Sequence, residues 1–285
     1  MQSLMKQLLP AQQLWFARLC IGAIQADGVV RLSEFEYFSR LASLLSATQE
    51  REELVKQVES GEPLSVEIKP PAGLAREILP QIFVELGRIC LVDDNLSATE
   101  TTYLRKISQA FGFSPIYEAQ LMDWCLEGLN WRQDRLDLCG LTPHRGRVPV
   151  HQLSQSQRIW YAELLISALN QGHPTRMEMS FLQGALGFLE DPAQRARLSR
   201  MIDQGERPEL GEVPQIKPEF IRLALAEALA LLGLSEGGQT AGYLARLVQV
   251  TGLPKERVEE ISDWLDQGLQ WTATGRDLAQ CGEFV

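Results

Sequence analysis

Two short acidic segments stand out for the spacing of their carboxylates. Asp27 and Asp93 each lie where a helix is expected to end, and each is followed seven residues later by a glutamate, Glu34 or Glu100, in the first turn of the next expected helix. Hard cations such as Ca²⁺ bind several carboxylate and carbonyl oxygens, which two neighbouring acidic turns could supply. A glutamate in a first helical turn also complements the helix dipole and closes a capping box. The spacing favours this structural role and leaves a cation site as the alternative.

Other reactive residue types show no pattern of a catalytic site. The sequence lacks the glycine-rich phosphate-binding motifs and the motifs of common hydrolases and zinc proteases. Its three histidines, His144, His151 and His173, have no helical ligand spacing. Cys139 with His144 and His151 is a conceivable metal site, although histidines in loops are more often solvated. We therefore expect a protein that is not an enzyme.

The elements that must position these residues are helices. Apolar residues recur at steps of three and four, and no alternating β-branched run occurs, which predicts an all-α fold. Ser33 with Glu36 and Ser97 with Glu100 have the spacing of capping boxes, and Pro80 is expected to kink or split its helix. The predicted helices cover residues 10–27, 33–46, 47–60, 72–93, 97–111, 114–130, 155–171, 175–189, 191–204, 218–233, 236–251 and 254–270.

A repeated phrase organises the chain. The segment 123–131, Asp-Trp-Cys-Leu-Glu-Gly-Leu-Asn-Trp, returns 140 positions later as Asp-Trp-Leu-Asp-Gln-Gly-Leu-Gln-Trp at 263–271. Matching Tyr-Leu and Gly-Phe or Gly-Leu pairs precede both copies. The repeat predicts two tandem, duplicated domains, 1–131 and 154–285, joined by a linker over 132–153 that contains proline and glycine and no helical period.

The tryptophans of the phrase have two possible roles. Trp124 and Trp131 are seven residues apart and so share one helix face, with Gly128 between them leaving room for a neighbouring backbone. They would form an aromatic docking surface or the core packing of a closing helix. Because packing is what both copies must share, and a tryptophan buries a large area, core packing is favoured.

The acidic segments also carry a family resemblance. Ala26-Asp27-Gly28 lies between two expected helices, is followed by a Ser/Glu-rich helix start, and is answered half a domain later by Val92-Asp93-Asp94. This arrangement resembles the TerB-like domains of bacterial tellurite-resistance and DnaJ-associated proteins. The resemblance covers the first domain and extends to the second through the repeat. Asp94 departs from it, because the family usually has glycine at this place.

The resemblance implies an all-helical, non-catalytic domain of bacterial stress and envelope-linked signalling systems, in which paired acidic turns are associated with divalent cations. By position it assigns Asp27, Glu34, Asp93 and Glu100 as ligands of Ca²⁺ or another divalent cation, and we add Asp94. The second domain is degenerate at these turns, since its counterparts are Gln171, Gly172, Glu178, Gly233 and Thr240. A single carboxylate cannot replace four or five, so we expect any cation in the first domain only.

Composition limits the partners. The formal net charge of -10 and the absence of a basic cluster argue against nucleic acid and against an anionic membrane surface. The sequence has neither a signal peptide nor a long apolar run, and its five scattered cysteines suggest reduced thiols, so we expect a cytoplasmic protein without membrane insertion. The leading hypothesis is an interaction or adaptor protein with a protein partner, and the alternative is a sensor of divalent cations or tellurite stress.

Overall fold

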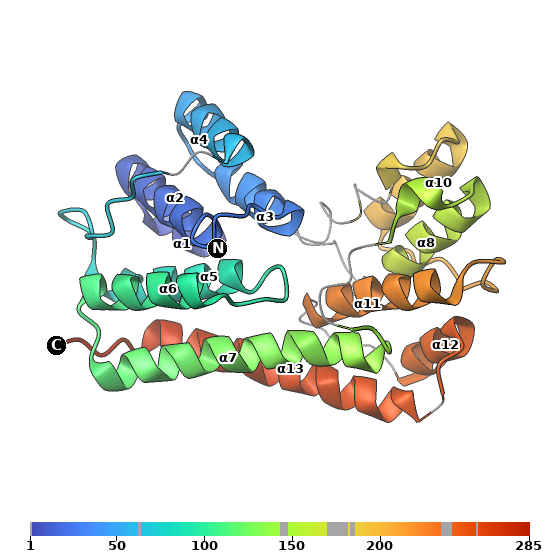
Figure 1. Cartoon of the computed structure of the whole chain (residues 1–285). Coiled ribbons are helices and arrows are strands. Elements are labelled where there is room, and N and C mark those ends of the chain that lie inside the picture. Colours follow the sequence, from blue (N-terminus) through green and yellow to red (C-terminus); the bar gives the residue numbers. More distant parts are fainter. Residues whose placement is uncertain are drawn as a thin grey trace. The chain divides into compact units, whose positions relative to one another are not determined.

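A computed structural model of the chain describes residues 2–61, 64–142, 148–169, 182, 186–234, 241–254 and 256–285 (Figure 1). The described residues form helices and no strand, as the sequence predicted; an isolated antiparallel bridge joins Phe113 and Phe284. None of their helices is both long and apolar enough to cross a membrane. The chain divides into two compact units, which we call unit 1 (Met1–Asn130 with Gln270–Val285) and unit 2 (Trp131–Leu269).

Unit 1 is built around α2, which packs against α3, α4, α5 and α6. Phe16 on α2, Phe38 on α3 and Phe83 on α5 are fully buried in its core. Its elements are α1 (Gln2–Gln7), α2 (Pro10–Ile24), α3 (Leu32–Ala42), α4 (Thr48–Ser60), the 3-10 turn η1 (Arg76–Ile78), α5 (Leu79–Cys90), α6 (Ala98–Phe111), and parts of the long helices α7 (Pro115–Leu138) and α13 (Arg257–Gln280).

Unit 2 has α8 packed against α10 and α11, with α12 against α11. Leu164, Leu165, Leu225 and Leu229 form part of its buried core. Its described elements are η2 (Val150–Gln152), α8 (Gln155–Ser167), α10 (Pro192–Gln204), α11 (Pro218–Leu234), α12 (Ala241–Thr251), and the remaining parts of α7 and α13. Most of the helix predicted at 175–189 lies outside the described residues.

Several predicted helix boundaries are confirmed and others are wrong. The predicted helix over 72–93 begins only at Leu79, because Pro80 sits in the first turn of α5, where its missing N–H costs no hydrogen bond, and does not kink the helix. The predicted capping box of Ser33 and Glu36 is also wrong, since α3 begins at Leu32 and Glu34 accepts the N–H of Arg31, the residue before the helix.

The region predicted as a linker, 132–153, differs from the prediction in its first part. Helix α7 continues to Leu138, because Trp131 and Leu136 extend its buried stripe beyond the repeated phrase. The C-terminal residues also group differently from the predicted domain 154–285. Gln270–Val285 belongs to unit 1, together with the N-terminal part of the chain.

The repeated phrase forms reciprocal tryptophan pairs. In unit 1, Trp124 stacks on Trp271 with ring centroids 4.8 Å apart, and each indole N–H donates to the other residue's carbonyl oxygen, at 3.0 and 2.9 Å. In unit 2, Trp131 and Trp264 do the same, with centroids 4.9 Å apart and hydrogen bonds of 2.8 and 2.7 Å. All four side chains are buried, so core packing, the favoured interpretation, is their role here.

Glycines make the close approach of these indoles possible. A Cβ atom on Gly128 would lie 2.6 Å from the Trp271 ring, and one on Gly268 would lie 2.4 Å from the Trp131 ring. Both distances are far below the contact distance of about 3.5–4.0 Å between carbon atoms. The glycine that both copies of the phrase share is therefore required by the indole of the other copy.

Candidate functional site

The first acidic turn follows α2 and is held by its own side chains. Asp27 accepts the N–H of Val29 with Oδ1 at 2.9 Å, and Gly28 adopts a left-handed conformation at φ 79°. Glu34 accepts the N–H of Arg31 with Oε2 at 2.7 Å, which satisfies one free donor at the start of α3. Asp27 and Glu34 therefore both serve the turn from α2 to α3.

The second acidic turn, between α5 and α6, repeats this construction. Asp93 accepts the N–H of Asn95 with Oδ1 at 3.1 Å. Ser97 and Glu100 form a full capping box, as predicted: Glu100 Oε2 accepts the Ser97 N–H at 2.7 Å, and Ser97 Oγ accepts the Glu100 N–H at 3.1 Å. Asp94 has a φ of 61° and takes the left-handed position that Gly28 takes in the first turn. An aspartate tolerates this conformation better than most residues.

Arg31 joins the two turns. Its Nη1 lies 2.8 Å from Asp27 Oδ2, and its Nε lies 3.0 Å from Asp93 Oδ2. The Asp93 side chain is only 4% exposed, whereas that of Arg31 is 35% exposed. One partly exposed guanidinium thus bridges the aspartates of both turns.

The electrostatics show that four carboxylates share one field. Burial raises the pKa of Glu34 to about 8, and the charges of Asp93 and Glu100 add to the effect. Burial likewise raises the pKa of Glu100, helped by the charges of Asp93 and Asp27. The pKa of Asp93 is also raised, mainly by burial, with Arg31 opposing and Asp94 adding to the rise. The fold therefore pairs Arg31 with Asp27 and Asp93, and it places Glu34 and Glu100 near enough for the charge of Glu100 to raise the pKa of Glu34.

One observation favours a divalent cation in this cluster, and two observations oppose it. Glu34 is 1% exposed, and its Oε1 has no hydrogen-bond partner among the described residues, so an oxygen is left for a cation or a proton. Arg31, however, already bridges Asp27 and Asp93. In the described part of the chain, no group of three or more His, Cys, Asp or Glu side chains is placed to hold a metal ion. The arrangement described here is an internal ion-pair cluster, and the cation site stays a prediction.

Arg31 is the residue that the sequence interpretation missed. Its position four residues after Asp27 is a spacing at which opposite charges often pair, and this was the available signal. Its contact with Asp93 had no local signal, because it depends on the packing of α2 against α5. The sequence therefore indicated the pair of Arg31 with Asp27, whereas only the fold shows the pair of Arg31 with Asp93.

Only some of the residues that the sequence placed opposite the acidic turns belong to the described part of unit 2. Gln171, Gly172, Glu178 and Thr240 lie outside the described residues. Gly233, which the sequence placed opposite Asp93, lies within α11, and a Cβ there would meet the rings of Trp131 and Trp264 at 2.9 Å. Gly87 on α5 similarly approaches a tryptophan, Trp124, and also the sulfur of Cys125. The comparison of Gly233 with Asp93 stays a prediction from the sequence.

The remaining metal and thiol candidates are unfavourable as described. Cys139 is fully buried, and burial raises its pKa to about 12, so it is a neutral thiol and a poor ligand at neutral pH. His151 is exposed in η2, whereas His144 and His173 lie outside the described residues. Cys20, Cys90 and Cys125 are free and buried, and Cys281 is free and exposed.

The pKa of Glu34 predicts a pH effect on stability. The folded pKa of about 8 exceeds the usual value for glutamate, so Glu34 is easier to ionise in the unfolded chain than in the folded protein. The folded state is therefore favoured fully below about pH 4, and this advantage is lost as the pH rises through 8. Glu34→Gln keeps an oxygen acceptor without the charge. We expect the melting temperature of the variant, relative to wild type, to rise between pH 5 and about pH 9. The exposed Glu59→Gln serves as control, and parallel profiles for Glu34→Gln and wild type would contradict the prediction.

Comparison with models of known protein families gave no match to this chain. No curated protein and no solved structure matches it significantly either. The resemblance to TerB-like domains therefore remains a prediction from the residues of the two acidic turns.

Proposed function

We propose that this chain is a non-catalytic interaction or adaptor protein of the bacterial cytoplasm, built from two TerB-like helical domains and serving a stress or envelope-linked signalling system. Its proposed partner is another protein. The polar residues of the two acidic turns support the non-catalytic part of this proposal. Their hydrogen bonds and ion pairs stabilise the turns and the helix starts, which is a structural role. The observation that carries it is a surface hollow on unit 1.

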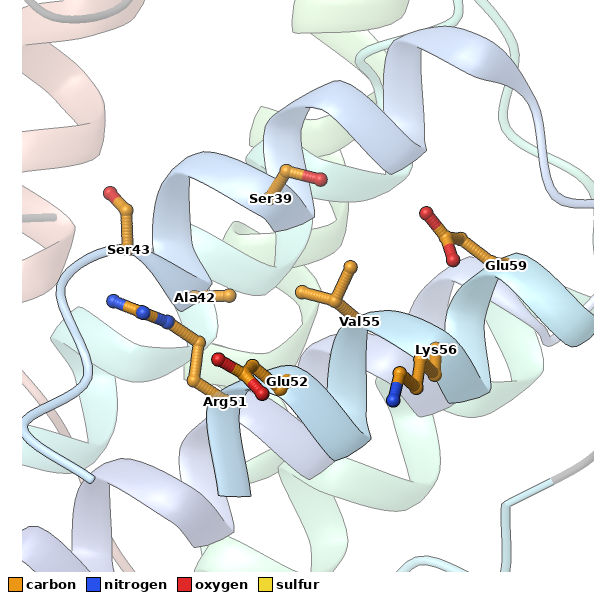
Figure 2. A pocket seen from close by; sticks show the side chains of 8 residues that line it. All are labelled: Ser39, Ala42, Ser43, Arg51, Glu52, Val55, Lys56 and Glu59. Atoms are coloured by element: carbon orange, nitrogen blue, oxygen red, sulfur yellow. The ribbon is translucent and has the colours of Figure 1, made fainter. Parts of the chain in front are cut away.

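This hollow lies between α3 and α4 (Figure 2) and has a volume of about 360 Å³. Ala42 and Val55 face each other across its floor, and charged side chains of α4 surround them. An apolar floor with a charged rim is the usual anatomy of a protein contact surface. The lining residues are Ser39, Ala42, Ser43, Arg51, Glu52, Val55, Lys56 and Glu59.

The proposal is tested by co-purification with the full-length chain. Val55→Glu places a charge on the floor of the hollow and is expected to abolish recovery of a partner that wild type recovers reproducibly. Leu126→Glu, which changes an exposed leucine on α7 outside the hollow, is the matched control and should recover it fully. A partner retained by Val55→Glu would move the contact elsewhere, and the lack of any specific partner would count against the adaptor function.

A second candidate function is the sensing of a divalent cation, and the unpartnered Oε1 of Glu34 favours it. For the cluster to bind Ca²⁺, Arg31 would have to release Asp27 and Asp93. The partial exposure of its side chain allows such a movement. The cation would then replace the guanidinium as the positive charge of the cluster.

This candidate predicts a specific pattern of melting temperatures. Ca²⁺ should raise the melting temperature of wild type, by mass action on the folded state. It should raise that of Arg31→Gln more, because this variant leaves the carboxylates without their internal cation. The double variant Asp27→Asn with Asp93→Asn should not respond. If Ca²⁺ leaves Arg31→Gln unchanged, the cluster is structural only.

A further inference from the structure

Within unit 1, the segment that follows α13 pairs with the corner between α6 and α7 through a single antiparallel bridge. Ser114 donates its N–H to the Glu283 carbonyl oxygen at 2.9 Å, and Val285 donates its N–H to the Gly112 carbonyl oxygen at 2.9 Å. These bonds form the antiparallel bridge between Phe113 and Phe284. The corner between α6 and α7 therefore offers one backbone donor and one backbone acceptor to an extended peptide.

The side chains around this corner form an aromatic seat. Phe113 is 4% exposed and is surrounded by other rings, with centroid distances of 5.0 Å to Tyr117, 5.6 Å to Phe111 and 6.0 Å to Phe83. Phe284 adds its ring to this cluster at 5.4 Å from Phe113. We call the surface made by Arg76, Phe113 and Ser114 the seat.

Charged and polar groups of the seat contact the same short segment. The Arg76 guanidinium carbon lies 4.5 Å from the centroid of the Phe284 ring, and its Nη2 lies 3.4 Å from the Val285 carbonyl oxygen. Ser114 Oγ lies 3.4 Å from Glu283 Oε2. The seat therefore contacts a glutamate followed by a phenylalanine, through a hydroxyl and through a cation over the ring.

The aromatic residues of the seat are more deeply buried than the segment that occupies it. Phe113 and Tyr117 are buried in unit 1, whereas Phe284 is only half-buried and the Val285 side chain is 86% exposed. Segments with few buried apolar contacts and exposed hydrogen bonds open locally at low free-energy cost. Release of residues 282–285 would leave the other rings of the aromatic cluster in place.

We propose that the seat is a peptide-binding site for an extended segment of a protein partner in which an acidic residue precedes an aromatic one. Residues 282–285 are its internal occupant, which such a partner displaces. Pairing of an added strand with a free backbone edge is a common mode of peptide recognition, with pockets for side chains giving specificity. This inference rests on the proposed function as a protein-binding adaptor and names a second contact surface for it.

The test uses the full-length Phe284→Ala variant, which removes the ring of the internal occupant. A fluorescent peptide Gly-Glu-Phe-Val, the chain's own sequence at 282–285, is titrated and its anisotropy measured. We expect it to bind Phe284→Ala at least about fivefold more tightly than wild type, where the internal segment competes. The peptide Gly-Glu-Ala-Val should not bind, and adding Arg76→Ala to the variant should weaken binding about two- to fivefold.

A second measurement uses the wild type and does not depend on that variant. Amide hydrogen exchange should be faster for Val285 than for the core amides of α2, and faster still in Arg76→Ala. Equal protection of Val285 and α2, or no peptide binding by a folded Phe284→Ala, would overturn the proposal. A concentration-dependent dimer of wild type would also overturn it, by assigning the seat to the exchanged segment of a second copy. These measurements use no partner protein. A negative result would therefore count against the seat alone, whereas a failed co-purification would count against the adaptor function.

Discussion

Replacing Trp124 by alanine is expected to lower the free energy of unfolding by about 3–5 kcal/mol, the usual range for a buried tryptophan. The side chain is 1% exposed and stacked on Trp271. Its indole ring also fills the space above Gly87 and Gly275, where a Cβ would lie 2.9 and 2.8 Å from it. The variant therefore creates a cavity between α5, α7 and α13 and also leaves the carbonyl oxygen of Trp271 without its indole donor.

Urea unfolding followed by circular dichroism measures this loss, since tryptophan fluorescence would change with the substitution itself. Leu126→Ala on the same helix is the matched control, because this leucine is 49% exposed. Its effect should stay within about 0.5 kcal/mol. A loss below about 1 kcal/mol for Trp124→Ala would show that the Trp124–Trp271 stack is not formed as described.

Gly128→Ala is expected to destabilise the protein by about 1–3 kcal/mol, although alanine is the better helix former. The added methyl group would lie 2.6 Å from the Trp271 ring, so α7 or α13 must shift to accommodate it. Thermal unfolding followed by circular dichroism gives the sign of the effect. Gly268→Ala should behave alike, because its methyl group would meet Trp131 at 2.4 Å.

Gly187→Ala provides the matched control for both glycine variants. Gly187 stands in a helical position, and among the described residues outside its own helical turn no atom lies within 4 Å of an added Cβ. Alanine should therefore leave the melting temperature unchanged or raise it, through its better helix propensity. A rise of the melting temperature in Gly128→Ala as well would mean that the two helices do not approach as closely as the indole positions require.

The sequence was most informative where structure depends on neighbouring residues. Ser97 caps α6, as its spacing with Glu100 predicts. Glycines are likewise a local signal for helix ends, and Gly61 and Gly205 follow α4 and α10 in left-handed conformations. These features depend on the chemistry of a single helix end, which a few adjacent residues determine. The assignment of these acidic residues as cation ligands, in contrast, stays a prediction, because the structure pairs Asp27 and Asp93 with Arg31.

Features that depend on tertiary packing could not be found in this way. The contact of Arg31 with Asp93 needs two turns that are distant in sequence, and the bridge of Phe113 with Phe284 needs the two ends of unit 1. The continuation of α7 to Leu138 likewise depends on the stacking of Trp131 with Trp264, since the local sequence contains a proline- and glycine-bearing stretch soon afterwards. In each case the deciding partner is more than 60 residues away.

The discontinuous composition of unit 1 has a consequence for synthesis on the ribosome. Unit 2 is one continuous stretch, Trp131–Leu269, and all of it is made before Gln270–Val285. Trp124 and Phe113 are translated early, but they can form their ring contacts only after Trp271 and Phe284 have been made. The part of the chain that is made first is thus the last to receive all of its residues.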